Sequence, residues 1–597
     1  MFLSLSVCCI STRWYKQMGR EKVSLLIRGA KVFNTYLKRF READVAVVND
    51  RFYYIDIMQK TEFEAERTID AHGQYMIPGL VDIHMHIESS MMTPGAFAQC
   101  LAANGVTTIV SEPHEMANVK GMRGIREMIR AGSKAPVDIF YGIPSSVPST
   151  DETLETTGGR IDYEDMKELL AYPEVVCVGE VMNYRGVIQA GSQLEINRFL
   201  SYVREKYPFF PVEGHCPKLM DLELAKFLSL GINADHTEHT LEEIRQRMEN
   251  GMFLEIQQKM LGRELFDYIR DNHLYEHCAF VTDDTMADVL WKKGQLNYVV
   301  SEAVTLGFPL EEAVYCATYT PCRRMHLDDR GAIAPGKLAD FQLMRRPESF
   351  RPERVFKRGR EIFPAPQTGE EVETYRFPAD FYQSVQVGKV TPEFFRIAVP
   401  EHSGEVQVRV IEVEPSGTQT RLKPVTMRVR DGYLDWKDSG CLLAVVLERH
   451  GKNETAGFGF LTGSCHTRGT LASTYMHDHH NLMVAGDDVS DMAFAVNRIR
   501  KMQGGCLAVY QGEILAELAL PVCGLLSDRP VAEIGAGLAL VRKAMERLGY
   551  RHENPVMSFA CLGLPVSPAW KLTNLGLVSV QEGKRKSLII EKGGNES

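Results

Sequence analysis

Two hydrophobic patterns divide the first half of the chain. Short β-rich segments separated by polar turns occupy residues 23–34, 43–56 and 67–79, and they predict a small β unit. From residue 80 onward, short apolar runs alternate with helical stretches such as TPGAFAQCLAANG and YEDMKELLAYP. This alternation is typical of βα units and therefore of a parallel sheet.

The number of apolar runs favours a closed barrel. Eight strand–helix repeats over about 250 residues match the size of a (β/α)8 barrel. An open, doubly wound sheet is the competing architecture, but the first strand lacks the glycine-rich phosphate-binding fingerprint of that class. The eight runs lie at 80–86, 107–113, 138–145, 175–181, 210–215, 232–236, 252–258 and 278–284.

Short β segments return after the barrel, in the stretch DDRGAIAPGKLADFQLM, and we expect them to complete the small β domain. Farther on, alternating strands such as EVQVRVIEV are mixed with amphipathic helices, which predicts an α+β domain. The predicted α/β layout is an extension without structure (1–17), the first part of a small β-sandwich domain (18–77), a metal-dependent (β/α)8 barrel (78–327), the second part of the β domain (328–375) and a C-terminal α+β domain (376–597).

The composition narrows the class of protein. The chain of 597 residues has a net charge of -10 and a pI of about 6.0, so we expect no binding to nucleic acid or membrane. Its 13 scattered cysteines include no C-x-x-C pair, which favours a reducing cytoplasm. Residues 1–17 make a poor signal peptide, and the sequence leaves open whether translation starts at Met1 or Met18.

Side chains that can bind a metal follow most of the predicted strands. A lone histidine is more often structural, but the carboxyl ends of barrel strands converge on one face, where active sites lie. We therefore expect the side chains at these ends to form one metal site. They are His84 and His86, His114 and Glu115, Glu180, His215, His236, and Asp283 with Asp284.

Four of these histidines and two carboxylates suit a divalent ion such as Zn, Mn or Fe(II). Six ligands exceed what one catalytic ion usually takes, so Glu180 could bridge two ions. Such a pair lowers the pKa of a bound water and gives hydroxide near neutral pH. Asp283 would accept the proton of that water, while Asp284, its neighbour on a strand, should point to the opposite face. The chemistry implied is hydrolysis at an sp² carbon bearing nitrogen.

The C-terminal half contains one concentrated polar stretch, MHDHHNLMVAGDD. It holds His477, Asp478, His479 and His480, followed by Asp487 and Asp488. The simpler interpretation, which we favour from the sequence, is a polar loop beside a strand. The alternative is that the loop reaches the mouth of a barrel, in its own or a neighbouring subunit, and shapes the pocket.

Several of these motifs together resemble the adenine deaminases of the amidohydrolase superfamily. The resemblance rests on PGLVDIHMHIESSMMTP, EPHEMANVKG, VGEVMN, GHCPKL and DDRGAIAPGKLAD, and on HDHHNLMVAGDD and NPVMSFACLGLPVSPAWKLT near the C-terminus. It covers the chain from about residue 22. The H-x-H-I-E-S-S motif followed by P-H-E is specific to this family, whereas H-x-H alone marks only the superfamily.

The resemblance implies an enzyme that replaces the 6-amino group of adenine through a metal-bound hydroxide, giving hypoxanthine and ammonia. It implies a binuclear Mn(2+) or Fe(2+) site, with Zn as an alternative. Matched residue by residue, it supports His84, His86, Glu180, His215, His236 and Asp283 as the metal ligands. Glu88 and Glu115 fall in family-like motifs and are candidate catalytic residues beside Asp283. We expect a cytoplasmic homo-oligomer that acts on a small purine.

The chain departs from the family pattern at three neighbours of the predicted ligands. The family commonly has Glu directly after the sixth-strand His, an Arg-Glu-Gly-Ser-like turn at the seventh strand, and Arg after the last paired acids. Here Thr237, Gln257 and Thr285 occupy these regions. A related amidohydrolase acting on another purine or on a cyclic amide or amidine is therefore the alternative. A non-catalytic, amidohydrolase-like binding protein would predict lost ligands, and all six are present.

Overall fold

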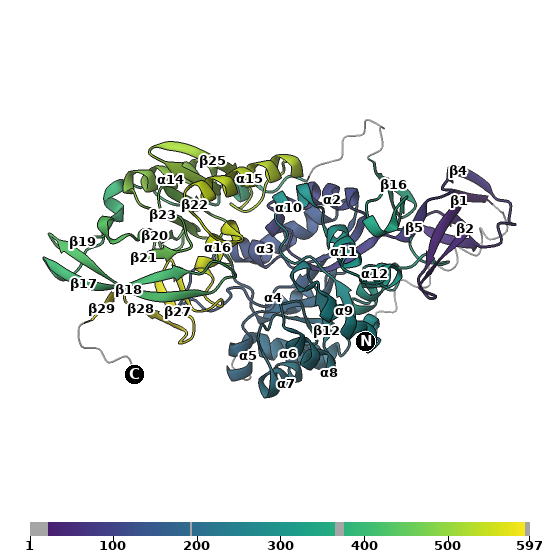
Figure 1. The fold of residues 1–597 in the computed structure, drawn as a ribbon, viewed down its shortest axis with the longest axis horizontal. Coiled ribbons are helices and arrows are strands. Elements are labelled where there is room, and N and C mark those ends of the chain that lie inside the picture. Colours follow the sequence, from purple (N-terminus) through teal and green to yellow (C-terminus); the bar gives the residue numbers. More distant parts are fainter. Residues whose placement is uncertain (1–21, 191–193, 365–374, 592–597) are drawn as a thin grey trace.

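The computed structural model describes residues 22–190, 194–364 and 375–591 (Figure 1). The expected N-terminal extension and Met18 lie outside these residues. In Figure 1 the flanking sheet lies at one end of the molecule and the C-terminal domain at the other, with the parallel strands between them. Among the described residues, no helix is long and apolar enough to cross a membrane.

Strands from the two sides of the parallel segment form one eight-stranded flanking sheet, ordered β16-β15-β14-β5-β1-β2-β3 with β4 on β1. The antiparallel pairing of β14 with β5 joins its two halves, which are about 260 residues apart in sequence. The strands are β1 (Lys22–Asn34), β2 (Arg39–Val48), β3 (Arg51–Asp56), β4 (Glu64–Asp70), β5 (Tyr75–Pro78), β14 (Phe341–Met344), β15 (Arg354–Lys357) and β16 (Arg360–Phe363).

All eight predicted apolar runs contain a strand, and these strands pair in parallel. Five of them form a sheet of order β10-β9-β8-β7-β6, and three form a sheet of order β11-β12-β13. The strands are β6 (Leu80–Met85), β7 (Val106–Ser111), β8 (Asp138–Ile143), β9 (Val175–Val181), β10 (Val212–Gly214), β11 (Ala234–Asp235), β12 (Phe253–Ile256) and β13 (Cys278–Phe280).

Single backbone hydrogen bonds connect the two parallel sheets at both edges. The Asn233 amide donates to the Val212 carbonyl at 3.1 Å, beside β10 and β11. The Asp283 amide donates to the His84 carbonyl at 3.0 Å, beside β13 and β6. The parallel strands therefore form a curled arrangement whose two ends approach each other.

Helices connect the parallel strands and follow the last of them. Some begin at strong local signals: Thr240 caps α8 through a reciprocal capping box with Glu243, which satisfies amides at the helix start. The helices are α2 (Pro94–Ala103), α3 (His114–Gly132), α4 (Tyr163–Leu169), α5 (Tyr184–Ala190), α6 (Glu195–Lys206), α7 (Asp221–Ser229), α8 (Leu241–Glu249), α9 (Arg263–Asp271), α10 (Ala287–Lys292), α11 (Leu296–Thr305), α12 (Leu310–Cys316) and α13 (Tyr319–Arg324).

The C-terminal domain is built on a ten-stranded sheet of order β19-β18-β17-β21-β20-β23-β22-β24-β25, with β29 on β17, and on a three-stranded sheet β26-β27-β28. Its elements are β17 (Gly404–Val413), β18 (Thr420–Arg430), β19 (Tyr433–Asp435), β20 (Leu442–Leu447), β21 (Ala456–Gly463), β22 (Thr470–Ser473), β23 (Leu482–Gly486), α14 (Val489–Met502), β24 (Gly505–Tyr510), β25 (Glu513–Ala519), α15 (Val531–Arg547), α16 (Pro555–Ala560), β26 (Trp570–Thr573), β27 (Gly576–Ser579), β28 (Lys584–Lys586) and β29 (Ile589–Ile590).

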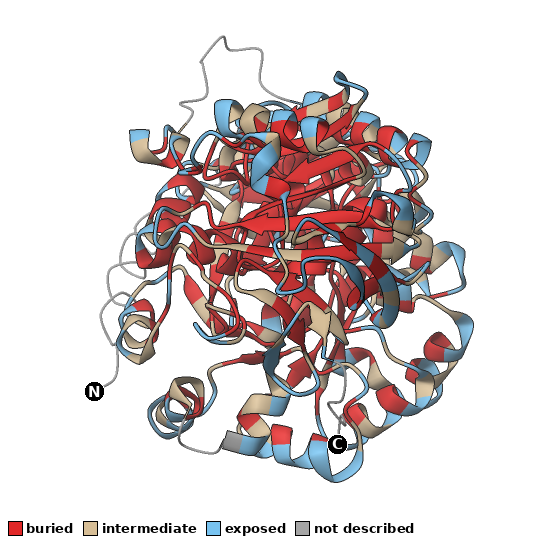
Figure 2. Ribbon diagram, turned by 90° about the vertical axis from the view of Figure 1, so that its left-hand side faces the viewer, coloured by how far each residue is buried: buried red, intermediate tan, exposed pale blue. Residues whose placement is uncertain are grey.

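The large sheet buries both of its faces. In β20, Leu443 and Val445 pack in a cluster that includes α14, whereas Ala444 and Val446 belong to a core that also contains Met85 of β6. Successive strand residues point to opposite faces, so one face of this sheet shares its core with the parallel strands. Figure 2 shows that buried residues are concentrated in the interior of the molecule. The two parts thus share a continuous apolar core.

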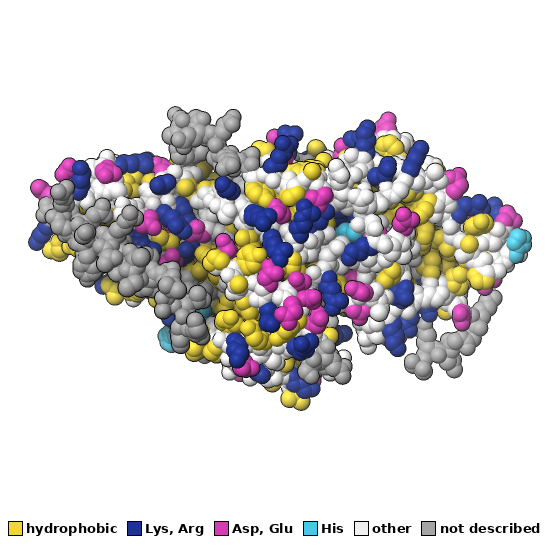
Figure 3. All heavy atoms as spheres, turned by 180° about the vertical axis from the view of Figure 1, so that it is seen from behind, with side chains coloured by type: hydrophobic (Ala, Val, Ile, Leu, Met, Phe, Trp, Pro, Cys, Tyr) yellow, Lys and Arg dark blue, Asp and Glu magenta, His cyan; other side chains and the backbone are white. Residues whose placement is uncertain are grey.

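The surface drawn in Figure 3 mixes basic and acidic side chains over its described residues. No extended basic area appears on that face, as expected from the net charge of -10.

Candidate active site

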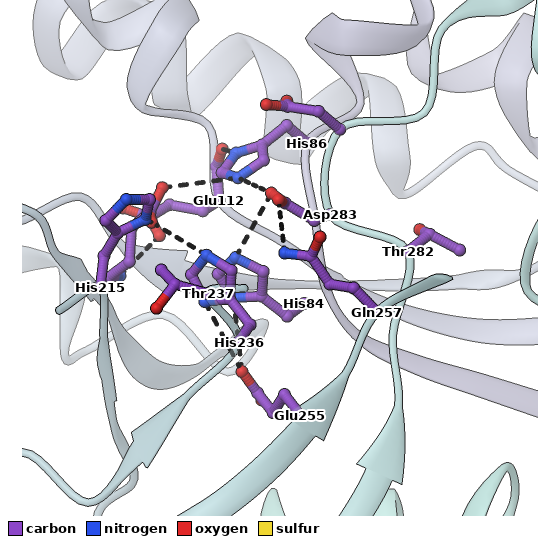
Figure 4. Close-up of polar contacts among 12 residues, drawn as sticks. His84, His86, Glu112, His215, His236, Thr237, Glu255, Gln257, Thr282 and Asp283 are labelled. Carbon is purple, nitrogen blue, oxygen red and sulfur yellow. Dashed lines mark hydrogen bonds and ion pairs between the residues drawn. The ribbon is translucent and has the colours of Figure 1, made fainter. Parts of the chain in front are cut away.

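The predicted strand-end residues come together at the carboxyl ends of the parallel strands (Figure 4). His84 lies on β6 and His86 just after it, and Glu180 lies on β9. His215 and His236 directly follow β10 and β11, and Asp283 lies in the loop after β13. Five of the six ligand candidates have side chains that are at most 13% exposed, while the His215 side chain is 36% exposed. The fold thus creates a buried polar cluster that is open on one side.

Glu180 lies at the centre of this cluster. Its Oε2 is 2.6 Å from His215 Nδ1 and 3.4 Å from His236 Nε2, and its Oε1 is 3.5 Å from His86 Nε2. Burial alone would raise the pKa of Glu180, but His215 and His236 hold it well below its usual value. Glu180 is therefore a carboxylate whose two oxygens face different histidines, the geometry that a bridging ligand requires.

Asp283 is the second carboxylate of the cluster, and it approaches His84 and His86. Its Oδ1 is 3.4 Å from His86 Nε2 and 3.9 Å from His84 Nε2, and its Oδ2 accepts a hydrogen bond from Gln257 Nε2 at 2.7 Å. Burial would raise the pKa of Asp283, but His86 and His236 lower it far below the ordinary range. Asp283 is thus ionised and available as a base.

The predicted separation of Asp283 and Asp284 is wrong. Strand β13 ends at Phe280, and Asp283 has a left-handed backbone with φ of 55°. Strand alternation therefore does not apply, and both carboxylates come within metal-ligand distance of His86. Asp284 keeps an exposed surface and accepts a hydrogen bond from Ser89 Oγ.

The donor set fits a pair of divalent cations. Two groups of three side chains could each hold an ion: one contains His84, His86 and Glu180, the other Glu180, His215 and His236. Among the described residues, the buried Nε2 atoms of His84 and His236 have no hydrogen-bond partner. A buried nitrogen without a partner costs free energy, and a bound cation would remove that cost. Imidazole and carboxylate are ligands that Zn, Mn and Fe(II) accept.

Two carboxylates that the sequence reasoning did not single out also belong to the cluster. Glu112, after β7, accepts a hydrogen bond from the Glu180 amide at 2.6 Å. Glu255, on β12, has its Oε2 3.9 Å from the Nδ1 atoms of both His84 and His236. Both are acidic residues inside the apolar runs that predict the strands. The sequence thus shows them as unusual, but it does not show that they face the cluster.

A hydrogen-bond network around the neighbouring Asp235 positions His236. The preceding residue, Asp235, accepts hydrogen bonds from Arg247 Nε at 2.9 Å and Thr237 Oγ1 at 2.9 Å, and its Oδ2 lies 2.9 Å from His239 Nε2. Burial would raise the pKa of Asp235, but His239 and Arg247 keep it well below its usual value. The network fixes the backbone from which His236 extends.

Glu88 and Glu115 lie beside the cluster, and Glu88 contacts the start of α3, the helix that carries Glu115. Glu88 is in a 3-10 turn, η1 (Glu88–Ser90), and its Oε1 accepts a hydrogen bond from the Met116 amide at 3.2 Å. Burial and the nearby Glu115 raise the pKa of Glu88 to about 7. Glu88 can therefore exchange a proton near neutral pH, which suits an acid–base role.

The C-terminal loop reaches this region within the same chain, so the simpler interpretation of a polar loop beside a strand is wrong for its first part. His477 Nδ1 is 3.0 Å from Glu115 Oε1, and Asp478 Oδ1 is 3.9 Å from His114 Nε2. Asp487 and Asp488 do follow the simpler interpretation: the first accepts a hydrogen bond from the Gly469 amide, and the second caps α14.

Comparison with known proteins agrees with this picture. The family model described as "Amidohydrolase family" matches residues 75–362, which include every ligand candidate. The fold and the cluster thus define an amidohydrolase. A second model, "Adenine deaminase C-terminal domain", matches residues 418–584.

Similar proteins cover nearly the whole chain. An adenine deaminase from Clostridium perfringens is 43% identical over 95% of this chain and 100% of its own length. Adenine deaminase 2 from Shouchella clausii is 43% identical over 96% of this chain and 99% of its own. This chain belongs to the adenine deaminase family. A solved adenine deaminase structure, 15% identical with a TM-score of 0.43 and covering 57% of this chain and 99% of that one, is too distant to add to the argument.

Proposed function

We propose that the protein hydrolyses adenine to hypoxanthine and ammonia. The observation that carries the proposal is the convergence of four histidines and two carboxylates on one buried cluster with unpartnered imidazole nitrogens. The relatives named adenine deaminase supply the substrate class. We also propose that the parallel strands close into a (β/α)8 barrel over residues 78–327, flanked by the β domain (18–77 and 328–375) and followed by the C-terminal domain (376–597).

We assign the metal shell to His84, His86, Glu180, His215, His236 and Asp283. Two divalent cations, Mn(2+) or Fe(2+) with Zn as the alternative, would lower the pKa of a water molecule and so supply the nucleophile near neutral pH. Glu180 is suited to hold both ions because its two oxygens face different histidines. Glu255 would orient this shell, since its Oε2 approaches His84 and His236. Glu112 would position Glu180, whose amide it binds, although Glu112, His114 and Glu180 also lie close enough together to hold an ion.

Proton transfer is assigned to three carboxylates. Asp283 takes the proton of the attacking water and delivers it to the departing amino group, as its ionised form and its place beside His86 favour. Glu88, with a pKa of about 7, protonates a ring nitrogen so that C6 accepts the nucleophile. Glu115 supports this step, because its charge contributes to the raised pKa of Glu88. The C6–O bond forms first; the proton from Asp283 then passes to the amino nitrogen, the C6–N bond breaks and ammonia leaves. The remaining hydroxyl proton returns to Glu88 as the product takes its 6-oxo form.

Ammonia release measured over a panel of purines, with metal content determined on the same sample, tests the proposal. We expect adenine to be the best substrate and activity to follow bound metal. Activity on a different purine or on a cyclic amide or amidine, with adenine inert, would support the alternative amidohydrolase. Full metal occupancy without turnover of any compound in the panel would refute the assigned activity.

Two further assignments follow from the same features. All cysteines that the structure describes are free and buried, which supports the reducing cytoplasm as the location. We expect the enzyme to assemble as a homo-oligomer, which light scattering on the purified protein tests.

A further inference from the structure

The C-terminal domain contributes a short loop to the candidate active site of its own chain. Tyr475 OH donates a hydrogen bond to Ser89 Oγ at 3.2 Å, and Ser89 in turn binds Asp284. On the other side, His477 and Asp478 approach Glu115 and His114. Residues 475–480, here named the histidine loop, therefore contact the site at two places.

His477 is held by two carboxylates through one ring nitrogen. Its Nδ1 is 3.0 Å from Glu115 Oε1 and 3.3 Å from Asp478 Oδ1. Two carboxylate oxygens near Nδ1 favour the ring form in which this nitrogen carries a hydrogen. Burial would lower the pKa of His477, but Tyr475, Glu115 and Asp478 raise it well above its usual value.

The other ring nitrogen of His477 lacks a partner. Within the described part of the chain, His477 Nε2 is buried without a hydrogen bond, and so are Asp478 Oδ2 and Glu88 Oε2. Leaving such a group unpaired is costly. Buried polar atoms without protein partners are expected where a polar ligand completes the contacts.

We propose that His477 is a substrate-binding residue that donates a hydrogen bond from Nε2 to N3 or N7 of the purine ring. The inference rests on the proposed function and deepens it, because it gives the C-terminal domain a direct role in recognising the base. N1 is excluded from the assignment because Glu88, the proposed acid of the reaction, serves that nitrogen. A purine offers acceptor nitrogens on both rings, and an N–H group of adenine matches the unpartnered carboxylate oxygen of Asp478.

Two substitutions separate a binding role from a structural one. The amide nitrogen of His477→Asn takes the place of Nδ1 and keeps the contact with Glu115, but it removes the donor at Nε2. The amide nitrogen of His477→Gln reaches the place of Nε2. His402→Ala is the matched control, because His402 is exposed on the same domain. All variants are compared as full-length, metal-loaded protein with measured metal content and thermal unfolding.

The binding of adenine, 1-deazaadenine, 3-deazaadenine and 7-deazaadenine is measured for each protein, together with kcat and KM for adenine. For the wild type, either the 3-deaza or the 7-deaza compound should bind about 10- to 100-fold more weakly than adenine, the loss expected for a hydrogen bond to a charged group. That discrimination should disappear in His477→Asn and return at least in part in His477→Gln. The control should behave as the wild type does.

Three results would overturn the inference. His477→Asn could discriminate among the analogues as the wild type does, the 1-deaza compound alone could be weakened, or His477→Asn could restore function where His477→Gln does not. If the wild type deaminates adenine in any of these cases, only the role of His477 is refuted. If the metal-loaded wild type neither binds nor deaminates adenine, the proposed function fails and this inference with it.

Discussion

Gly179 of β9 lies directly against the carboxylate of Glu112, which makes it a sensitive point of the site. A Cβ atom at Gly179 would be 2.3 Å from Glu112 Cδ and 2.5 Å from its Oε1, whereas ordinary contacts begin at 3.4 Å. Glu112 is buried and its Oε2 accepts a hydrogen bond from the Glu180 amide at 2.6 Å. Gly179→Ala therefore forces the Glu112 carboxylate away from the residue that it helps to position.

The size of the effect follows from these distances. Restoring an ordinary contact requires Glu112 to move by about 1 Å, and a misplacement of about 1 Å can reduce an enzymatic rate about 100-fold. We expect kcat for adenine to fall by about that factor. Overpacking a tight interior usually costs about 1–3 kcal/mol of stability, so Gly179→Ala should also unfold at a lower temperature.

The assay compares kcat, metal content and thermal unfolding for Gly179→Ala and for Gly95→Ala. Gly95 lies at the start of α2, where an added Cβ meets no atom within 4 Å, so this control should keep wild-type kinetics. Normal turnover and metal content in Gly179→Ala would refute the reasoning, because they would show that Glu112 can leave its position without harm.

Other perturbations test different parts of the structure. Asp283→Asn should reduce kcat at least ~100-fold with metal largely retained. Asp284→Asn should cost much less, because Asp284 is exposed and is bound by Ser89 Oγ; the reverse order would make Asp284 the acid–base. Purified protein should carry close to two divalent ions, and a chelator should abolish ammonia release; full activity without metal would contradict the assigned shell. Burial would raise the pKa of Asp138, but Lys357 and Arg330 lower it to about 2. This carboxylate should contribute about 2 kcal/mol of stability at pH 7, and because its folded-state pKa is depressed, that contribution is lost as the pH falls from about 4 towards 2. In urea unfolding, Asp138→Asn should be less stable than wild type at pH 7, with the difference narrowing below pH 4; a constant difference would refute the linkage.

The predictable part of the fold is local. All eight apolar runs contain parallel strands, because buried strands need continuous apolar residues whatever their neighbours. The side chains after those strands meet because parallel strand ends lie at one edge. Strands β10 and β11 are only three and two residues long, yet His215 and His236, which follow them, still reach Glu180.

Other features of the site could not be predicted, because they depend on where strands end and on how distant segments pack. The end of β13 at Phe280 placed Asp284 beside His86, and no periodicity marks that point. Glu112 and Glu255 lie inside their runs, and only the distances reveal that they face the cluster. The contact between Tyr475 and Ser89 spans 386 residues, so it follows from the packing of two domains on one core rather than from any local signal.

The contacts of Thr237, Gln257 and Thr285 explain the three departures from the family pattern. Gln257 donates a hydrogen bond to Asp283, Thr237 donates one to Asp235, and Thr285 Oγ1 donates one to the Thr282 carbonyl at 3.5 Å. Each side chain thus has a partner inside the protein, and the first two partners adjoin or belong to the proposed metal shell. Gln257 and Thr237 therefore help to orient the proposed metal ligands. They give no independent reason to prefer a substrate other than adenine, and the test of specificity falls instead on residues with unpartnered polar atoms, His477 first among them.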